Sequence, residues 1–204
     1  LRLLVRSILN PRFQKKFIDK ESPLLLYISP DRGTMKNDDI GEFKISKKIK
    51  EKLKNKKLLK KQLAQGKSAQ QILGFTDETM AKFYGAAYRL FEHRRYTEAA
   101  NAFLFLVTLN PYNHEYWVGL GMCSQLNKDY EAAIDAYEMA AICRIDSPVP
   151  YFYLAKCLFA LHDRESALQA LDLAIEYAEN HPEFYELKEQ AKSAKDLLLK
   201  DREA

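Results

Sequence analysis

The side chains that most often act in catalysis are few and scattered in this sequence. All four histidines are expected at helix ends or in turns, and they are His93, His114, His162 and His181. None belongs to an H-E-x-x-H pattern, and none forms a nucleophile and base arrangement with a neighbour. The sequence therefore predicts a protein that is not an enzyme and that needs no cofactor.

Two further features are tempting as chemical sites. Cys123 and Cys157 stand 34 residues apart, and a metal or redox pair can be imagined from them. Because no second pair of ligands accompanies them, we expect two small core residues and no metal site. With Cys143 they make an odd count, which favours free thiols in a reducing cytosol over a disulfide framework. Gly66-Lys67-Ser68 matches the end of a Walker A motif, G-x-x-x-x-G-K-[ST]. The motif also needs a glycine five residues before Gly66, and this sequence has Lys61 there.

The stretch that organises the chain covers residues 117–137. Tetratricopeptide repeats, which are helix pairs of about 34 residues, combine W-x2-L-G-x2-Y with a later A-x3-F. This stretch supplies Trp117, Leu120, Gly121, Ala133 and Tyr137. The same kinds of residue recur 34 positions earlier, at Phe83, Ala86, Ala87, Ala99 and Phe103, and 34 positions later, at Tyr151, Leu154, Ala155, Ala167 and Leu171. Three sets in register predict three consecutive repeats, and we expect these residues, Trp117 included, to pack the helices together.

The sequence thus predicts an all-α fold of three tetratricopeptide repeats in a right-handed α-solenoid, with an N-terminal helical arm and a C-terminal capping helix. The three-repeat domain is expected at 76–182, with repeats at about 80–113, 114–147 and 148–181. The cap is expected at 183–204, where the chain is amphipathic and rich in lysine on one side. No apolar run approaches the roughly 18 residues of a membrane helix, so no membrane span is expected.

The residues before the repeats are strongly basic. Between positions 44 and 61 ten lysines accompany one glutamate, a charge of +9, whereas residues 76–181 have fifteen Asp or Glu against eight Lys or Arg, a charge of −7. We expect a basic helical arm over 44–75. One interpretation is a helix that is solvated or packs in a dimer, and the other is a helix that makes electrostatic contact with nucleic acid or membrane. The arm has no interleaved aromatic residues, which argues against a specific nucleic-acid reader.

Residues 1–43 are expected to form an extension that precedes the arm. The first methionine is Met35, so we interpret residues 1–34 as poorly ordered or as lying upstream of the natural start. A genuine N-terminal helix is the alternative.

Function is expected on the inner faces of the first helices of the repeats, where such solenoids present a concave groove. The predicted groove residues are Tyr84, Tyr88, Phe91, Val118, Met122, Phe152, Lys156 and Phe159. An exposed aromatic stripe such as Tyr84, Tyr88 and Phe91 usually marks an interaction site, although the N-terminal segment or a dimer mate would also cover it. Repeat domains that clamp a terminal carboxylate carry lysine and asparagine here, whereas Lys156 is the one cation of this set. An extended, largely apolar peptide is therefore the expected ligand.

Several short motifs occur together within residues 62–180. They are the G-x-x-x-x-x-x-L-G segment Gly66–Gly74, the stripe of Tyr84, Tyr88 and Phe91, YTEAANAF, the following NPYN, and YWVGLG. Together they resemble the class II chaperones of type III secretion systems. The resemblance implies a homodimeric chaperone that binds a short segment of hydrophobic translocator proteins and keeps them soluble and export-competent in the bacterial cytoplasm. A general tetratricopeptide scaffold, with nucleic-acid or membrane contact through the lysine-rich arm, is the alternative.

Overall fold

The computed structural model describes residues 54, 55, 57, 61, 62 and 64–200. Within residues 65–200 the regular structure is helical, with eight α-helices and one 3-10 helix. The expected extension at 1–43, which contains Met35, lies outside the described residues, as do much of the expected arm and residues 201–204.

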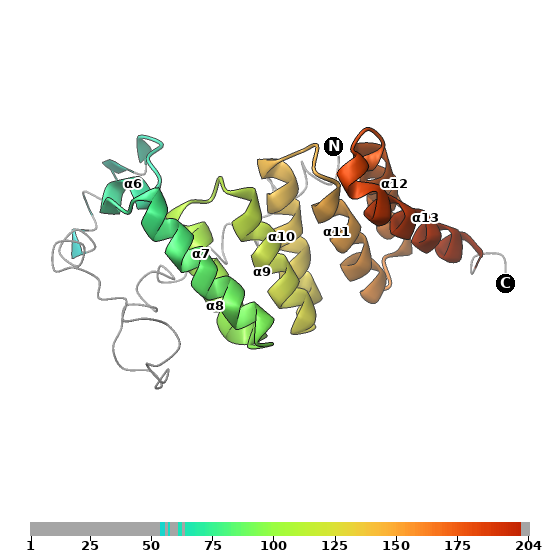
Figure 1. The fold of residues 1–204 in the computed structure, drawn as a ribbon, viewed down its shortest axis with the longest axis horizontal. Helices are drawn as coiled ribbons and strands as arrows, with labels where there is room; N and C mark the ends of the chain where they lie inside the picture. Colours follow the sequence, from blue (N-terminus) through green and yellow to red (C-terminus); the bar gives the residue numbers. More distant parts are fainter. Residues whose placement is uncertain (1–53, 56, 58–60, 63, 201–204) are drawn as a thin grey trace.

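The helices follow one another in a row along the molecule (Figure 1). They are α6 (Ala69–Leu73), α7 (Asp77–Glu92), α8 (Tyr96–Leu109), α9 (His114–Leu126), α10 (Tyr130–Cys143), α11 (Pro148–Ala160), α12 (Arg164–Ala178), the 3-10 helix η2 (Pro182–Phe184) and α13 (Tyr185–Lys200). From α7 onward each α-helix packs mainly against the α-helices before and after it, as in an α-solenoid. The starts of α8, α10 and α12 are 34 residues apart. The predicted all-α repeat fold is confirmed.

Local sequence explains where the helices begin. Side-chain oxygens accept hydrogen bonds from backbone N–H groups of the first turn at Thr76 before α7, Asn113 before α9, Asp129 before α10 and Asp163 before α12. The turns inside the three repeats also share one geometry, since Arg94, Lys128 and His162 have φ angles of 58°, 62° and 61°. These positions again lie 34 residues apart. The sequence did not reveal this shared turn, because glycine, the usual residue at positive φ, is absent from it.

Small residues allow the paired helices to approach closely. A Cβ atom on Gly121 would lie 2.6 Å from the ring of Tyr137, and one on Gly119 would lie 2.3 Å from the ring of Phe103. Both rings are buried. Trp117 is buried as well, and its Nε1 donates a hydrogen bond of 2.7 Å to the carbonyl oxygen of Pro111. The prediction that Trp117 is a core residue is confirmed.

The cysteines and the histidine His114, considered above as chemical groups, take part in packing and hydrogen bonding within the fold. Cys123 and Cys157 are buried free thiols, and burial raises the pKa of each to about 12. The prediction of two core cysteines is confirmed. His114 is buried, with its Nδ1 2.9 Å from the carbonyl oxygen of Ala140, so it joins α9 to α10. Over the described part of the chain, no group of three or more His, Cys, Asp or Glu is placed to hold a metal ion, and no helix has the length and apolarity of a membrane span.

Candidate peptide-binding groove

Three of the predicted groove residues form a continuous aromatic stripe along α7. Tyr84, Tyr88 and Phe91 are spaced by four and three residues, which places their side chains on one helical face. The rings of Tyr84 and Tyr88 stack with centroids 6.4 Å apart, and those of Tyr88 and Phe91 stack at 6.4 Å as well. Ala87 and Leu90 of the same helix are buried in the core. The helix therefore has separate packing and aromatic faces.

The stripe is fixed at one end and open in its middle. The half-buried ring of Tyr84 lies 5.9 Å from the ring of Phe103 on α8 and 5.9 Å from that of Tyr116 on α9. Burial, followed by the negative charge of Glu115, raises the pKa of Tyr84, so its hydroxyl stays protonated at neutral pH. Tyr88, by contrast, is 47% exposed. A ligand would therefore meet a rigid Tyr84 and an open Tyr88.

On α9 the predicted groove residues are aliphatic. Val118 is only 8% exposed and belongs to the core formed with α7 and α8. Met122 is half-buried and packs against both hydrophobic cores of the molecule. Val118 thus offers less surface than its position in the repeat suggests, whereas the flexible thioether of Met122 can adapt to a ligand.

The third group of predicted groove residues lies on α11. Phe152 is 4% exposed and Phe159 is 49% exposed. The ammonium of Lys156 lies 4.4 Å from the centroid of the Phe152 ring and 5.2 Å from that of Tyr153, which is a cation–π arrangement. Phe152 therefore supports Lys156, and the surface that α11 offers to a ligand consists mainly of Lys156 and Phe159.

A pocket of about 460 Å³ lies between α7 and α9, next to Tyr84. Its lining residues are Gln70, Asp77, Met80, Ala81, Tyr84, Asn110, Asn113, Glu115 and Tyr116. Tyr116 is the main residue that sequence reasoning missed, because groove positions counted within one repeat do not include it. The pocket forms between two repeats and α6. The sequence did contain one indication of this pocket, since Asp77 and Glu115 both lie in the first turn of the first helix of a repeat, and the two repeats are neighbours.

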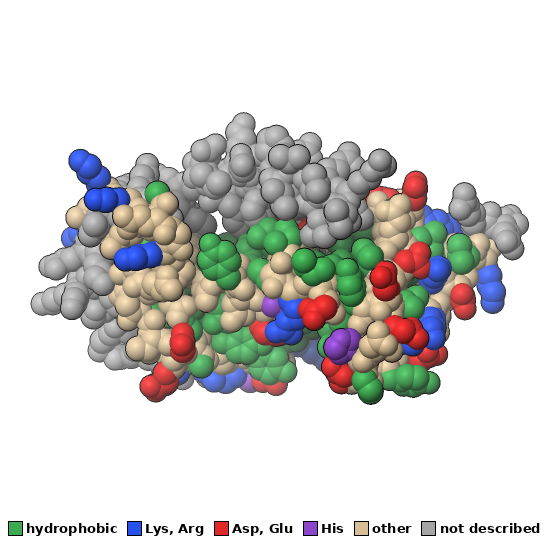
Figure 2. Space-filling view, turned by 90° about the horizontal axis from the view of Figure 1, so that it is seen from above, with side chains coloured by type: hydrophobic (Ala, Val, Ile, Leu, Met, Phe, Trp, Pro, Cys, Tyr) green, Lys and Arg blue, Asp and Glu red, His purple; other side chains and the backbone are tan. Residues whose placement is uncertain are grey.

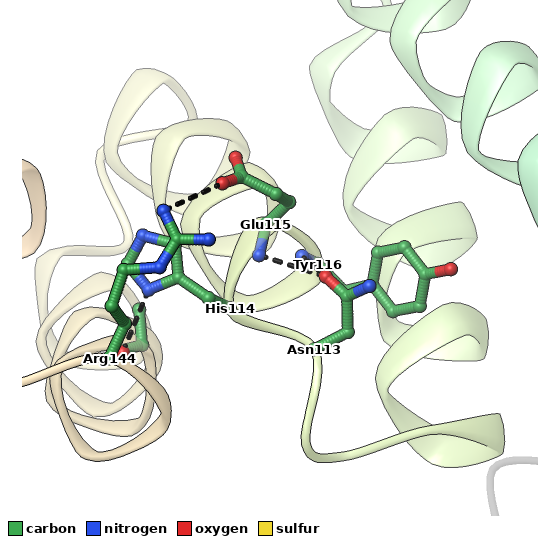
Figure 3. A network of polar contacts seen from close by, with 6 residues as sticks. Asn113, His114, Glu115, Tyr116 and Arg144 are labelled. Carbon is green, nitrogen blue, oxygen red and sulfur yellow. Dashed lines mark hydrogen bonds and ion pairs between the residues drawn. The ribbon is translucent and has the colours of Figure 1, made fainter. Parts of the chain in front are cut away.

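Polar contacts fix the start of α9 beside this pocket (Figure 3). Asn113 Oδ1 accepts hydrogen bonds from the backbone N–H groups of Glu115 and Tyr116, at 3.0 and 3.4 Å. The carboxylate of Glu115 lies 3.7 Å from Arg144 Nη1, and Figure 3 shows the ring of Tyr116 pointing away from Arg144. Both members of this ion pair are exposed, so it contributes only about 0–1 kcal/mol to stability. The backbone of α9 is therefore firmly held, while the Glu115 side chain is easily redirected.

One face of the protein has an apolar centre. Figure 2 shows it from above, with hydrophobic side chains gathered between the ends of the solenoid and acidic side chains more frequent toward the end formed by α12 and α13. Tyr88 and Phe159 are among the large hydrophobic side chains that stay exposed in the described part of the chain. Exposed apolar surface of this kind indicates a site for protein association.

Comparisons with known proteins place these features in a wider context. The tetratricopeptide repeat family matches residues 84–149. Low calcium response locus protein H of Yersinia pseudotuberculosis is 30% identical over 128 residues, which are 63% of this chain and 76% of that protein. The Yersinia enterocolitica type III secretion chaperone SycD, in complex with a peptide of the translocator YopD, has a TM-score of 0.61 and 29% identity over 62% of this chain and 97% of its own. PcrH of Pseudomonas aeruginosa, in complex with the chaperone binding region of PopD, has a TM-score of 0.62 and 25% identity over 63% of this chain and 97% of its own.

Proposed function

We propose that this chain binds a short extended segment of a hydrophobic translocator protein, because it belongs to the class II chaperones of type III secretion translocators. The observation that carries the proposal is the stacked stripe of Tyr84, Tyr88 and Phe91, which the packing of the solenoid leaves open at Tyr88. The relatives SycD and PcrH bind segments of the translocators YopD and PopD. Here too, binding keeps the cargo soluble and export-competent in the bacterial cytoplasm.

The chemistry of such a groove is reversible binding without turnover. A translocator carries apolar segments that aggregate or insert prematurely when they are exposed to water. Each ring that a ligand buries contributes about 1–3 kcal/mol. Tyr84 is already held by Phe103 and Tyr116, so it loses little side-chain freedom when a ligand binds. One anchored segment then retains the whole cargo.

The predicted groove residues divide into two roles under this proposal. Direct contact is assigned to the residues that keep accessible surface, which are Tyr84, Tyr88, Phe91, Met122, Lys156 and Phe159. Val118 and Phe152 are buried, so they support these contacts from beneath. A homodimer also fits the family, since SycD has been seen as an alternative dimer.

The proposal is tested by changing Tyr84→Ala and Tyr88→Ala together. We expect the double variant to lose co-purification of a translocator from the native cytoplasm, as identified by mass spectrometry, while its helical circular dichroism signal stays intact. The matched control changes Tyr112→Ala and Tyr185→Ala, two tyrosines that are 72% and 67% exposed and lie outside the stripe. Unchanged co-purification by the Tyr84 and Tyr88 variant would count decisively against the groove.

A further inference from the structure

The pocket between α7 and α9 has a chemical character that the aromatic stripe lacks. Its apolar wall consists of Met80, Ala81 and the rings of Tyr84 and Tyr116. Two acidic residues, Asp77 and Glu115, also line it, and none of the described residues that line it is a lysine or arginine. A volume of about 460 Å³ is sufficient for one long side chain of a bound peptide.

Most polar groups in and beside this pocket already form hydrogen bonds within the protein. Gln70, which is buried, donates from Nε2 to Asp77 Oδ1 at 2.8 Å and accepts from Asn110 Nδ2 at 3.2 Å. Thr76 and Asn113 accept hydrogen bonds from the backbone at the starts of α7 and α9. An anion would therefore find few free backbone donors and two carboxylates, so the pocket is suited to a cation.

One polar group of the pocket lining reaches solvent. Tyr116 is 7% exposed, its hydroxyl makes no hydrogen bond with a described residue, and no fully buried side-chain oxygen in the described part of the chain lacks a partner. The hydroxyl therefore keeps contact with water and can exchange it for a ligand group. Its oxygen can accept a hydrogen bond from an ammonium or guanidinium group.

The two carboxylates affect the pKa values of the two tyrosines that line the pocket. Burial comes first in raising the pKa of Tyr116, and the charge of Asp77 on α7 comes second. Burial also comes first in raising the pKa of Tyr84 on α7, where the charge of Glu115 on α9 comes second. Each carboxylate thus acts on the tyrosine of the neighbouring helix, so both negative charges lie near the residues that line the pocket.

We propose that this pocket is a subsite for a lysine or arginine side chain of the bound segment. The inference rests on the proposed function and adds a charge requirement to the apolar groove. The aliphatic stem of the basic residue packs on Met80 and Ala81. Its charged end lies between Asp77 and Glu115 and beside the faces of Tyr84 and Tyr116, where cation–π attraction adds to the ion pairing.

Arg144, which does not line the pocket, pairs with Glu115 when no ligand is bound. It lies 3.7 Å from Glu115, and both side chains are about half exposed. A weak, solvated ion pair of this kind is readily exchanged for a better-placed cation. The basic residue of the ligand therefore displaces Arg144 and draws Glu115 toward Tyr116.

The subsite is tested with random 12-residue peptides displayed on phage and selected on the full chain. Peptides selected on the wild-type protein are expected to carry Lys or Arg at a fixed spacing from their apolar residues. Selection on Glu115→Gln is expected to weaken this preference, and selection on the double variant with Asp77→Asn is expected to abolish it. Glu131→Gln is the matched control, since Glu131 is exposed and holds the same second position in α10 that Glu115 holds in α9.

Affinity measurements on the best selected peptide give the magnitude. Replacing its basic residue with norleucine should weaken binding by about 10-fold to the wild-type protein and by less than about 2-fold to Glu115→Gln. Arg144→Gln, which removes the competing cation, should strengthen binding by about 2-fold. If Asp77 and Glu115 serve only the helix dipole, their neutral variants will change stability and leave peptide selection unchanged.

The two proposals fail in distinguishable ways. Selected peptides that need Tyr84 and Tyr88 but lack a basic residue would overturn the subsite and leave the proposed function standing. Peptides that bind the double alanine variant at those tyrosines as tightly as the wild-type protein would overturn the groove, and the subsite with it. A basic preference that persists in Glu115→Gln with Asp77→Asn would also overturn the subsite.

Discussion

The packing positions and the groove positions of this solenoid differ in how much the residue type varies from one repeat to the next. At one packing position the three repeats carry Ala99, Ala133 and Ala167, each with no exposed surface. At one groove position they carry Tyr88, Met122 and Lys156, which share neither size nor charge. At this packing position the close approach of two helices requires a small residue in every repeat, whereas the groove position carries no such requirement. The variation along the groove can therefore distinguish one ligand from another.

The largest effect that tests this contrast comes from the same substitution on the two faces. Tyr137→Ala should lower the free energy of unfolding by about 3–5 kcal/mol, because Tyr137 is fully buried and its hydroxyl donates to Gln125 Oε1 at 2.8 Å. Tyr88→Ala should lower it by less than about 1 kcal/mol, because nearly half of that ring is already in water. Urea unfolding followed by circular dichroism measures both values. Equal losses at the two positions would remove the distinction between the faces.

A smaller effect is expected at two glycines that hold equivalent positions in consecutive repeats. Gly119→Ala should destabilise the protein by about 1–2 kcal/mol, since the new Cβ would lie 2.3 Å from the buried ring of Phe103. Gly85→Ala should instead stabilise it by up to about 1 kcal/mol, because a Cβ there meets nothing closer than Arg89 Nη1 at 3.6 Å and alanine favours a helix. Thermal unfolding gives both shifts. A destabilised Gly85→Ala variant would contradict the expectation that packing demand differs between these repeats.

The sequence predicted the packing side of the molecule better than the binding side. Gly121 and Tyr137 were placed correctly because helix packing forces the same residue types to recur at a fixed period. The burial of Phe152 beneath Lys156 was not expected, because it depends on which of two neighbouring side chains lies outermost. Tyr116 was missed for a different reason, since its pocket forms between repeats and depends on α6.

The smallest effect concerns the response of the packing side to alkaline pH. Tyr151 is buried and donates from its hydroxyl to the carbonyl oxygen of Ile145 at 3.2 Å. Burial, and then the neighbouring Tyr177, raise the pKa of Tyr151 to about 12 from 10.0. The folded state thus favours the protonated hydroxyl, so the stability from this group is complete below pH 10.0 and is lost as the pH rises through about 12.

Tyr151→Phe should therefore flatten the alkaline loss of stability while lowering stability at neutral pH by about 1 kcal/mol through the missing hydrogen bond. Urea unfolding at pH 8, 10 and 11 measures the two slopes, with pH values chosen around the ordinary pKa of tyrosine of about 10. Tyr112→Phe, at a position that is 72% exposed, is the control and should follow the wild-type slope. Buried Cys123 and Cys157 act in the same direction, since burial raises each thiol pKa to about 12. The flattening should consequently be partial, and a slope in Tyr151→Phe equal to that of Tyr112→Phe would show that this hydroxyl does not couple packing to pH.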